Sequence, residues 1–253
     1  DNLDQLNKIL EQQKTQIERH RDEIFEELKE TLLKTENLKK ESNTYKLKSI
    51  ANQMNPHFLF NILNVVKHFV LQNDSEKSEL YLGKLAKLMR MTLNNSLQES
   101  VKIKDEIEML KLYIDLEQLR TRNKFEYSFL MSNDLDLDYD EIPSMLIQPF
   151  IENSLLHGIY NKDDKGNLRI QLNKENNTLI CTIDDDGVGF SKAKEIAEKK
   201  RSTHVSVGTS LIDERLKLIS QIYDHEFSFE YQDLADGKDV SGGTRVILKM
   251  PLL

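Results

Sequence analysis

The chain has 253 residues, of which 31% are charged and 38% hydrophobic, and its formal net charge is −8 with a pI near 5.4. This acidic balance argues against a nucleic-acid-binding protein, whose surface would be basic, so we expect no nucleic-acid partner. The single cysteine, Cys181, excludes an intrachain disulfide framework and a multi-cysteine metal site. No apolar run is long enough to span a membrane, and no signal-peptide pattern opens the chain.

Residues 1–54 are predicted to form one continuous helix, because no glycine or proline precedes Pro56 and Glu, Lys, Gln and Leu dominate. The apolar positions at the three-four spacing of a coiled-coil seam are Leu3, Leu6, Leu10, Ile17 and Ile24. The seam then steps through Leu28 and Leu32, a spacing that resembles a stutter and would unwind the supercoil locally. A helix this polar would be marginal in water alone, so we predict a partner helix, most simply in a homodimer.

The stretch that follows, residues 52–61, places Pro56, His57 and three asparagines inside a helical pattern. A proline in a helix interior costs about 3 kcal/mol, so its presence suggests a function. A neutral imidazole is nucleophilic and accepts a phosphoryl group, which makes His57 a candidate catalytic residue. An isolated histidine beside a kink is more often a structural residue, and the stretch alone leaves both interpretations open.

Two further helices are predicted to form an antiparallel hairpin. The apolar face of the first is broader than a two-stranded seam, as is typical of a helix bundle, and comprises Phe58, Ile62, Val65, Val66, Phe69 and Val70. Residues 72–75 read as a turn with helix-capping residues. Residues 76–97 read as the second helix, with Leu82, Leu85, Leu88, Met89 and Leu93 on one side. Two such hairpins would make a four-helix bundle in a dimer.

From Val101 onward the pattern changes to mixed helices and strands. We expect helices over 104–121, from Pro143 onward with Pro149 inside, and over 209–223. We expect strands over 124–132, 167–173, 178–184, about 227–232 and 244–250, with a charged segment over 191–201. This order predicts an α+β domain with antiparallel strands and helices on one face of the sheet.

Within this block, residues 148–158 carry the first motif, in which Glu152, Asn153 and His157 interrupt an otherwise apolar helix. An asparagine amide oxygen is a hard ligand that suits Mg²⁺, which takes one or two protein oxygens together with phosphates and waters. The polar face of an ordinary amphipathic helix explains the same residues equally well.

The second motif, residues 184–190, follows directly after the apolar strand 179–183. A carboxylate at a strand end, such as that of Asp185, accepts hydrogen bonds, for example from an adenine amino group. Gly187 and Gly189 would let the backbone approach a ligand closely. An acidic turn is the alternative, which the position after a buried strand disfavours.

The third motif, residues 204–211, leads into the last predicted helix. Gly208 and the hydroxyl residue Thr209 would then lie at a helix N-terminus, where free N–H groups and the helix dipole favour a phosphate. Taken singly, this is a common helix cap. Residues 241–244, which end in Thr244, are a plain turn at least as often as a site.

In this order, the stretches "NPHFLFN" (55–61), "QPFIENSLLHG" (148–158) and "DDDGVGF" (184–190) and the Gly-led helix resemble the LytS-like branch of sensor histidine kinases, which carry a GHKL-type ATP-binding domain. The resemblance covers roughly residues 45–253. It implies a coiled coil over 1–50, a dimerising hairpin with the phosphoacceptor histidine over 51–99, and a GHKL-type α/β sandwich over 100–253.

The resemblance also implies roles for single residues. His57 would be the phosphoacceptor, Asn153 would hold Mg²⁺, and Asp185 would bind the adenine amino group. The nucleotide pocket would also include His157, Gly187, Gly189, Gly208, Thr209 and Thr244, with Gly208 closing it over the phosphates. Other branches place an acidic base directly after the histidine, where this chain has Phe58, so we predict Glu152 as the base. Many relatives have glycine and asparagine where this chain has Ser206 and Leu211.

The implied activity is autophosphorylation of His57 from ATP with Mg²⁺, followed by transfer to an aspartate of a response regulator receiver domain. Because the chain begins with Asp1, we expect an upstream sensor region, and we expect this part to be the cytoplasmic portion of a membrane-anchored receptor. Two alternatives stay open at this point. One is a GHKL ATPase in which His57 is structural, and the other is a nonenzymatic dimerising adaptor.

Overall fold

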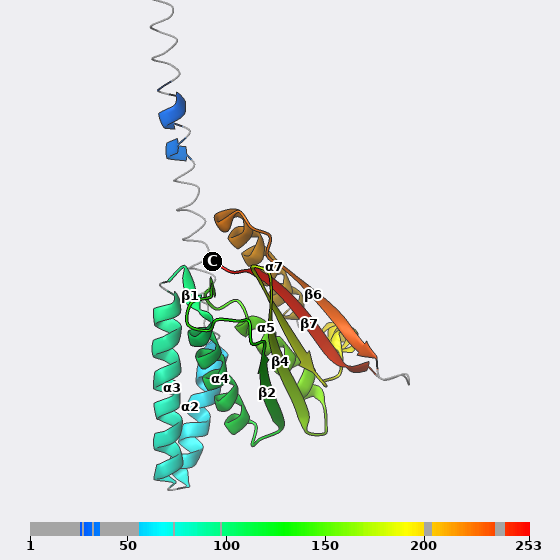
Figure 1. Cartoon of the computed structure of the whole chain (residues 1–253). Coiled ribbons are helices and arrows are strands. Elements are labelled where there is room, and N and C mark those ends of the chain that lie inside the picture. The colour runs from blue at the N-terminus through cyan, green and yellow to red at the C-terminus, as the bar shows by residue number, and fades with distance from the viewer. Residues whose placement is uncertain are drawn as a thin grey trace, which may run out of the picture. The chain divides into compact units, whose positions relative to one another are not determined.

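The computed structural model (Figure 1) describes residues 26, 28–31, 33–35, 56–72, 74–96, 98–199, 204–235 and 241–253. The chain divides into two compact units, residues 1–46 and 47–253. In the first unit the described residues are helical, as predicted. The seam positions from Leu3 to Ile24 and the stutter residue Leu32 lie outside the described residues. Across the described parts of the chain, none of the helices combines the length and the apolar character that crossing a membrane requires.

The second unit opens with the predicted hairpin, α2 (Pro56–Leu71) and α3 (Ser75–Ser96). Asp74 caps α3, because its Oδ1 accepts a hydrogen bond from the Lys77 backbone N–H at 3.1 Å. The buried face of α3 includes Tyr81, Leu85 and Leu88. Leu82, Met89 and Leu93, which we expected on that same face, are exposed instead. The helix therefore carries two apolar faces, of which one is covered within the chain.

Next, β1 (Ser100–Lys102) leads into α4 (Ile103–Arg120), and β1 pairs antiparallel with β3 (Glu141–Pro143). The main sheet has the order β2-β4-β5-β7-β6. Its strands are β2 (Phe125–Met131), β4 (Gly166–Glu175), β5 (Thr178–Asp185), β6 (Ser228–Ala235) and β7 (Ser241–Pro251). All described pairs are antiparallel except β2 with β4, so the all-antiparallel prediction is wrong there. A long helical crossover between these two strands permits the parallel pairing.

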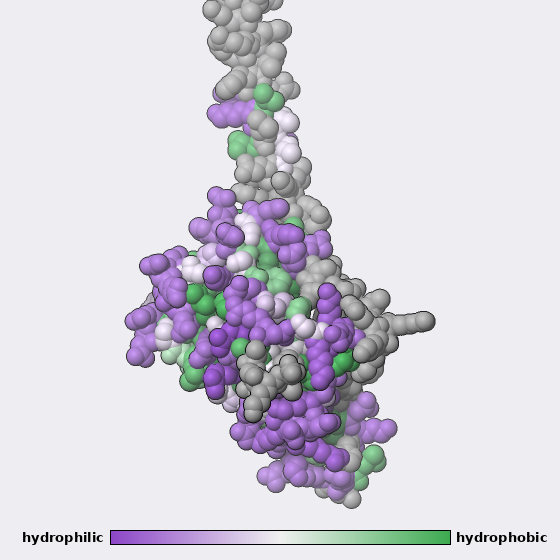
Figure 2. All heavy atoms as spheres, turned by 90° about the vertical axis from the view of Figure 1, so that its right-hand side faces the viewer, coloured by the Kyte–Doolittle hydropathy of each residue, from purple (hydrophilic) through white to green (hydrophobic). Residues whose placement is uncertain are grey.

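One face of this sheet forms the core, as predicted. Burial alternates along β5, where Leu179, Cys181 and Ile183 are buried and their neighbours are partly exposed. The buried side packs with apolar residues of α4, α5 and α7, and α4 and α5 lie along the same side of the sheet in Figure 1. The surface seen in Figure 2 is mostly hydrophilic. The chain therefore has an α+β fold with helices on one face of a mixed sheet.

The segment after Pro143 corrects one prediction. Pro143 ends β3 and does not open a helix, because Met145 adopts a left-handed backbone with φ +57°. Two hydrogen bonds from Arg215 hold this turn. Its Nη1 donates to the Met145 carbonyl at 2.9 Å, and its Nη2 donates to the Ser144 carbonyl at 2.6 Å. The helix α5 (Gln148–Asn153) starts later, with Pro149 in its first turn, where a missing N–H costs no helical hydrogen bond.

After α5 the helix widens into a π-helical turn, η1 (Ser154–Gly158), and tightens into a 3₁₀ turn, η2 (Ile159–Asn161). The charged segment that we left without regular structure is the helix α6 (Phe190–Lys199). The final helix, α7 (His204–Tyr223), begins before the predicted residue 209, so Gly208 lies inside the helix and not in front of it. A single glycine is tolerated within a helix at a cost of about 1 kcal/mol, which explains why the chain continues through it.

Candidate functional site

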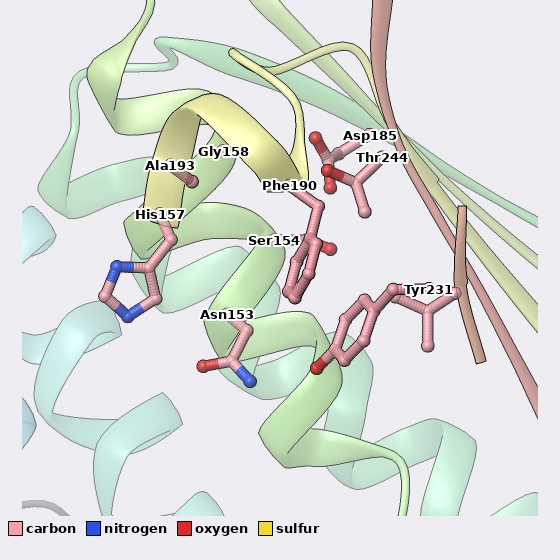
Figure 3. Close-up of a pocket in the computed structure, with 10 residues that line it drawn as sticks. Asn153, Ser154, His157, Gly158, Asp185, Phe190, Ala193, Tyr231 and Thr244 are labelled. Atoms are coloured by element: carbon pink, nitrogen blue, oxygen red, sulfur yellow. The ribbon is translucent and has the colours of Figure 1, made fainter. Parts of the chain in front are cut away.

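A pocket opens between the helices and the end of the sheet (Figure 3). Its volume is about 440 Å³ when the space open to solvent at its mouth is included. Its lining comes from α5, η1, β5, α6, β6 and β7, elements that are distant in the sequence. The lining residues are Asn153, Ser154, His157, Gly158, Asp185, Phe190, Ala193, Tyr231, Thr244 and Val246.

Four of the residues predicted as a site meet in this pocket: Asn153, His157, Asp185 and Thr244. They come from three separate stretches of the chain, with Asn153 and His157 in the same one, so the fold brings together what the sequence showed only as separate motifs. The His157 ring points away from Asp185, toward the other side of the helix (Figure 3). The roles that we assigned to these side chains stay predictions.

Asp185 is the acidic group of the pocket. It ends β5, pairs with Thr244 on β7, and is 2% exposed. Its Oδ1 accepts a hydrogen bond from the Gly187 backbone N–H at 3.0 Å. Burial raises the pKa of Asp185 to about 6, and hydrogen bonds from Ser154, Gly187 and Thr244 oppose that rise. The carboxylate is therefore charged near neutral pH and available as an acceptor at the closed end of the pocket.

Glycines allow the chain to close around this carboxylate. A Cβ at Gly158 would lie 2.6 Å from Asp185 Oδ1, and one at Gly187 would lie 2.3 Å from the Gly158 carbonyl carbon. Gly243 has φ +113°, and a Cβ there would meet the Asp185 carbonyl oxygen at 1.8 Å. Gly187 and Gly189 are not among the lining residues, and Gly189 makes the left-handed turn, φ +85°, that precedes α6. Gly187 thus supports Asp185 through close backbone packing.

Two aromatic residues of the pocket were missed by the sequence analysis. Phe190 and Tyr231 stack with ring centroids 4.5 Å apart and an interplanar angle of 11°. Phe190 ends the second motif, which was a usable signal, because a large apolar side chain directly after two glycines has to pack somewhere nearby. Tyr231 lies within β6, and nothing in its local sequence distinguishes it from other strand residues.

Glu152, the predicted general base, is not among the residues that line the pocket. Its Oε1 accepts a hydrogen bond from Gln148 Nε2 at 2.8 Å. Burial raises the pKa of Glu152 to about 7, and the charge of Glu117 on α4 adds to that rise, while the Gln148 bond opposes it. A carboxyl with this pKa suits proton transfer near neutral pH. Its assignment as the base stays a prediction.

The remaining predicted residues lie in helices whose side chains here fall outside the described part of the structure. His57 is in the first turn of α2, and Gly208 and Thr209 are in α7. Their backbone is helical. Their part in the site stays a prediction.

A divalent cation bound with a nucleotide stays a prediction for this pocket. Among the described residues there is no group of three or more His, Cys, Asp and Glu side chains that could hold a metal ion by itself. Mg²⁺ needs no such group, since one or two protein oxygens with phosphate oxygens suffice, and the Asn153 amide can supply one. The buried Asp185 acceptor would face the amino group of a base.

The known proteins that this chain is similar to are named as histidine kinases or sensor proteins. The family model described as histidine kinase matches residues 45–125. The sensor protein LytS of Enterococcus faecalis is 27% identical over 207 residues, which cover 81% of this chain and 34% of that protein. LytS of Oceanobacillus iheyensis is 34% identical over 160 residues, which cover 63% of this chain and 27% of that protein. The chain is similar to LytS-like sensor histidine kinases. The resemblance drawn from the sequence motifs is thereby confirmed.

Sensor histidine kinase YpdA of Escherichia coli is also similar to this LytS-like chain, at 29% identity over 187 residues, or 74% of this chain and 32% of that protein. The chain spans about a third of the length of these curated relatives. Among solved structures, histidine kinase AdeS of Acinetobacter baumannii aligns with TM-score 0.41 and 12% identity over 72% of this chain and 82% of that one. Histidine kinase ThkA in complex with response regulator protein TrrA aligns with TM-score 0.39 and 13% identity. The alignment covers 86% of this chain and 66% of that chain.

Proposed function

We propose that this chain is the ATP-dependent kinase portion of a two-component sensor. It would phosphorylate its own His57 from ATP and Mg²⁺ and pass the phosphoryl group to an aspartate of a response regulator receiver domain. The observation that carries the proposal is the pocket in which Asn153, His157, Asp185 and Thr244 meet. The similarity of the chain to LytS-like sensors supports the same activity.

The residues of the pocket divide the recognition of the nucleotide between them. Asp185 would accept a hydrogen bond from the adenine amino group, beside Thr244. Asn153 would offer its amide oxygen to Mg²⁺, which would offset the charge of the phosphates. Gly208 and Thr209, in the helix α7, would contact the phosphates, and His157 of η1 would complete the lining of the nucleotide pocket.

In the transfer step, a lone pair on the neutral imidazole of His57 would attack the γ-phosphorus. The new N–P bond forms as the bond from the γ-phosphorus to the bridging oxygen breaks, and ADP leaves with that electron pair. The proton on the other ring nitrogen is then released, with Glu152 as the predicted acceptor. In the second step a regulator carboxylate would attack the same phosphorus and free the imidazole.

We also propose a homodimer built on the hairpin. Large apolar side chains of α2 and α3 are exposed in the single chain, namely Leu63, Val70, Leu71, Leu80, Leu82, Met89 and Leu93. Two copies of the hairpin would cover them in a four-helix bundle. The predicted coiled coil over 1–50 precedes the hairpin in the sequence, and the boundary between the two compact units falls close to the end of that stretch. The division at residue 99 remains part of this proposal, as does the cytoplasmic side of a membrane-anchored sensor.

The test is incubation with γ-³²P-ATP and Mg²⁺. We expect acid-labile label on the unmodified chain, none on His57→Gln, and at least tenfold less on Asn153→Ala. Unchanged labelling of His57→Gln would contradict the proposal and favour an ATPase with a different phosphoacceptor or none. An absence of heat when the unmodified chain is titrated with ATP in a calorimeter would favour the nonenzymatic adaptor.

A further inference from the structure

Tyr231 on β6 lies against the helix that carries Asn153. Its ring stacks on Phe190 at 4.5 Å and also contacts Phe150 of α5, with centroids 6.4 Å apart at 51°. Phe150 is fully buried, so this contact ties the ring to the body of α5. Asn153 lies on the same helix, three residues after Phe150. The contact with Phe150 therefore also fixes the Tyr231 ring relative to Asn153.

The other side of the ring is fixed through α6. Asp233 on β6 accepts hydrogen bonds from the backbone N–H groups of Phe190 at 2.6 Å and of Ser191 at 3.3 Å, and the Ser191 hydroxyl donates to it as well. These bonds fix the start of α6 against β6. Phe190 is thus held over Tyr231, and the stacked pair forms a rigid wall of the pocket.

The hydroxyl of Tyr231 is the unusual part of this wall. It is buried, and within the described part of the chain it has no hydrogen-bond partner of good geometry. Figure 3 shows the Asn153 amide nitrogen on the side that faces this hydroxyl and the amide oxygen on the opposite side.

We infer that Tyr231 is a positioning residue for Asn153. Its hydroxyl oxygen would accept a hydrogen bond from the Asn153 amide nitrogen and so keep the amide oxygen turned toward a divalent cation in the pocket. This inference rests on the proposed function, in which Asn153 is the Mg²⁺ ligand. An amide that a second residue orients is prepared for the cation, whereas a freely rotating one loses side-chain entropy on binding it.

The inference predicts an effect confined to the cation. ADP is titrated into the purified chain in a calorimeter, once with Mg²⁺ and once with EDTA. For Tyr231→Phe, which keeps both ring contacts, we expect about fivefold weaker binding of ADP with Mg²⁺ and unchanged binding in EDTA. Tyr139→Phe, which removes a hydroxyl from a side chain that is 82% exposed, is the matched control and should change neither value.

A double-mutant cycle adds the decisive comparison. In the Asn153→Ala background, Tyr231→Phe should have no further effect, because the group that it positions is gone. Equal losses with Mg²⁺ and EDTA, or no loss at all, would overturn the inference. So would a loss of the same size in the Asn153→Ala background.

Failure of the proposed function has a different signature. If the unmodified chain binds no ADP, or if Asn153→Ala keeps the full Mg²⁺ dependence, both proposals are wrong. If Asn153→Ala abolishes that dependence and Tyr231→Phe leaves it intact, the present inference alone is wrong. Should Tyr231→Phe fail to fold, ¹³Cζ-tyrosine NMR on the unmodified chain decides: the Tyr231 signal should shift with ADP and Mg²⁺ and stay with ADP and EDTA, and equal shifts would count against the inference.

Discussion

At the scale of single residues, a buried carboxyl and a buried guanidinium hold the segment in front of the pocket. Glu106 on α4 is fully buried, and its Oε2 accepts a hydrogen bond from the Met145 backbone N–H at 3.2 Å. Arg215 of α7 donates to the carbonyls of Ser144 and Met145 on the other side of the same turn. Glu106 Oε1 and Arg215 Nε have no hydrogen-bond partner among the described residues. Glu106 and Arg215 therefore fix the turn that leads into α5 from two sides, at the cost of burying two ionisable groups.

The first prediction from this pair concerns pH. Burial raises the pKa of Glu106 from 4.5 to about 7, and the Met145 bond and the charge of Arg215 only partly oppose that rise. A carboxyl whose pKa is higher in the folded than in the unfolded chain adds to the free energy of unfolding. This contribution is complete below the pKa of the unfolded chain, and it is lost as the pH rises through the folded-state value of about 7. In Glu106→Gln the group no longer titrates. The free energy of unfolding of the unmodified chain, relative to that of the variant, should thus fall by about 2–3 kcal/mol between pH 5 and 8.

Urea unfolding of both proteins at several pH values in that range measures this difference. Glu108→Gln is the matched control on the same helix, since Glu108 is exposed and pairs with Lys87 at the surface. Its difference from the unmodified chain should stay flat. A flat difference for Glu106→Gln as well would show that Glu106 remains ionised in the folded chain across the whole range.

At the scale of elements, the hairpin is joined to the rest of its unit through α3 and α4. The buried Tyr81 hydroxyl donates to the Leu116 carbonyl of α4 at 2.9 Å. Lys84 pairs with Asp115 at 2.5 Å, and the other oxygen of Asp115 accepts from Tyr127 on β2. These contacts link the helix after the histidine to the first helix and strand of the sheet domain.

The buried hydrogen bond should matter more than the surface ion pairs. We predict that Tyr81→Phe lowers the free energy of unfolding by about 1 kcal/mol, because a buried carbonyl loses its partner from α3. Lys87→Gln breaks an exposed pair with Glu108 and should cost less than about 0.5 kcal/mol. Urea unfolding followed by circular dichroism gives both values. Faster amide exchange in α3 and α4 should accompany the first change only. Equal costs would indicate that Tyr81 does not secure this contact.

At the scale of the whole molecule, the proposed dimer is the property most open to test. Leu93 of α3 is 62% exposed in the single chain, on the face that lies away from Leu85 and Leu88. A lysine there would place charge in the apolar centre of the proposed four-helix bundle. We predict that the unmodified chain sediments with twice its mass of 29.5 kDa and that Leu93→Lys shifts it to the monomer.

The control for this prediction is Leu130→Lys. Leu130 is 49% exposed, but it lies on β2 at the edge of the sheet, and its replacement should leave the sedimentation unchanged. A monomeric unmodified chain at micromolar concentration, or a dimer that tolerates Leu93→Lys, would contradict the proposed bundle.

Much of the fold could be predicted from local patterns. The hairpin, the helix α4 and the strands β4 and β5 were expected close to their observed bounds, because amphipathic periodicity and turn residues are properties of neighbouring positions. The helix predicted from Pro143 was wrong, because the backbone there depends on Arg215, which lies far along the chain. The parallel pairing of β2 with β4 was missed for a similar reason, since partner choice depends on the whole crossover.

The candidate site divides in the same way. The sequence alone determined which motifs are present and in what order, and so the chemical groups, Asn153 and Asp185 above all, with the LytS-like resemblance that they support. Only the tertiary structure decided that these two side chains share a pocket, that Glu152 lies outside its lining, and that Tyr231 stands beside Asn153. Local patterns report the periodicity of one segment, whereas a pocket is made by side chains from six elements whose mutual placement depends on how the whole core packs.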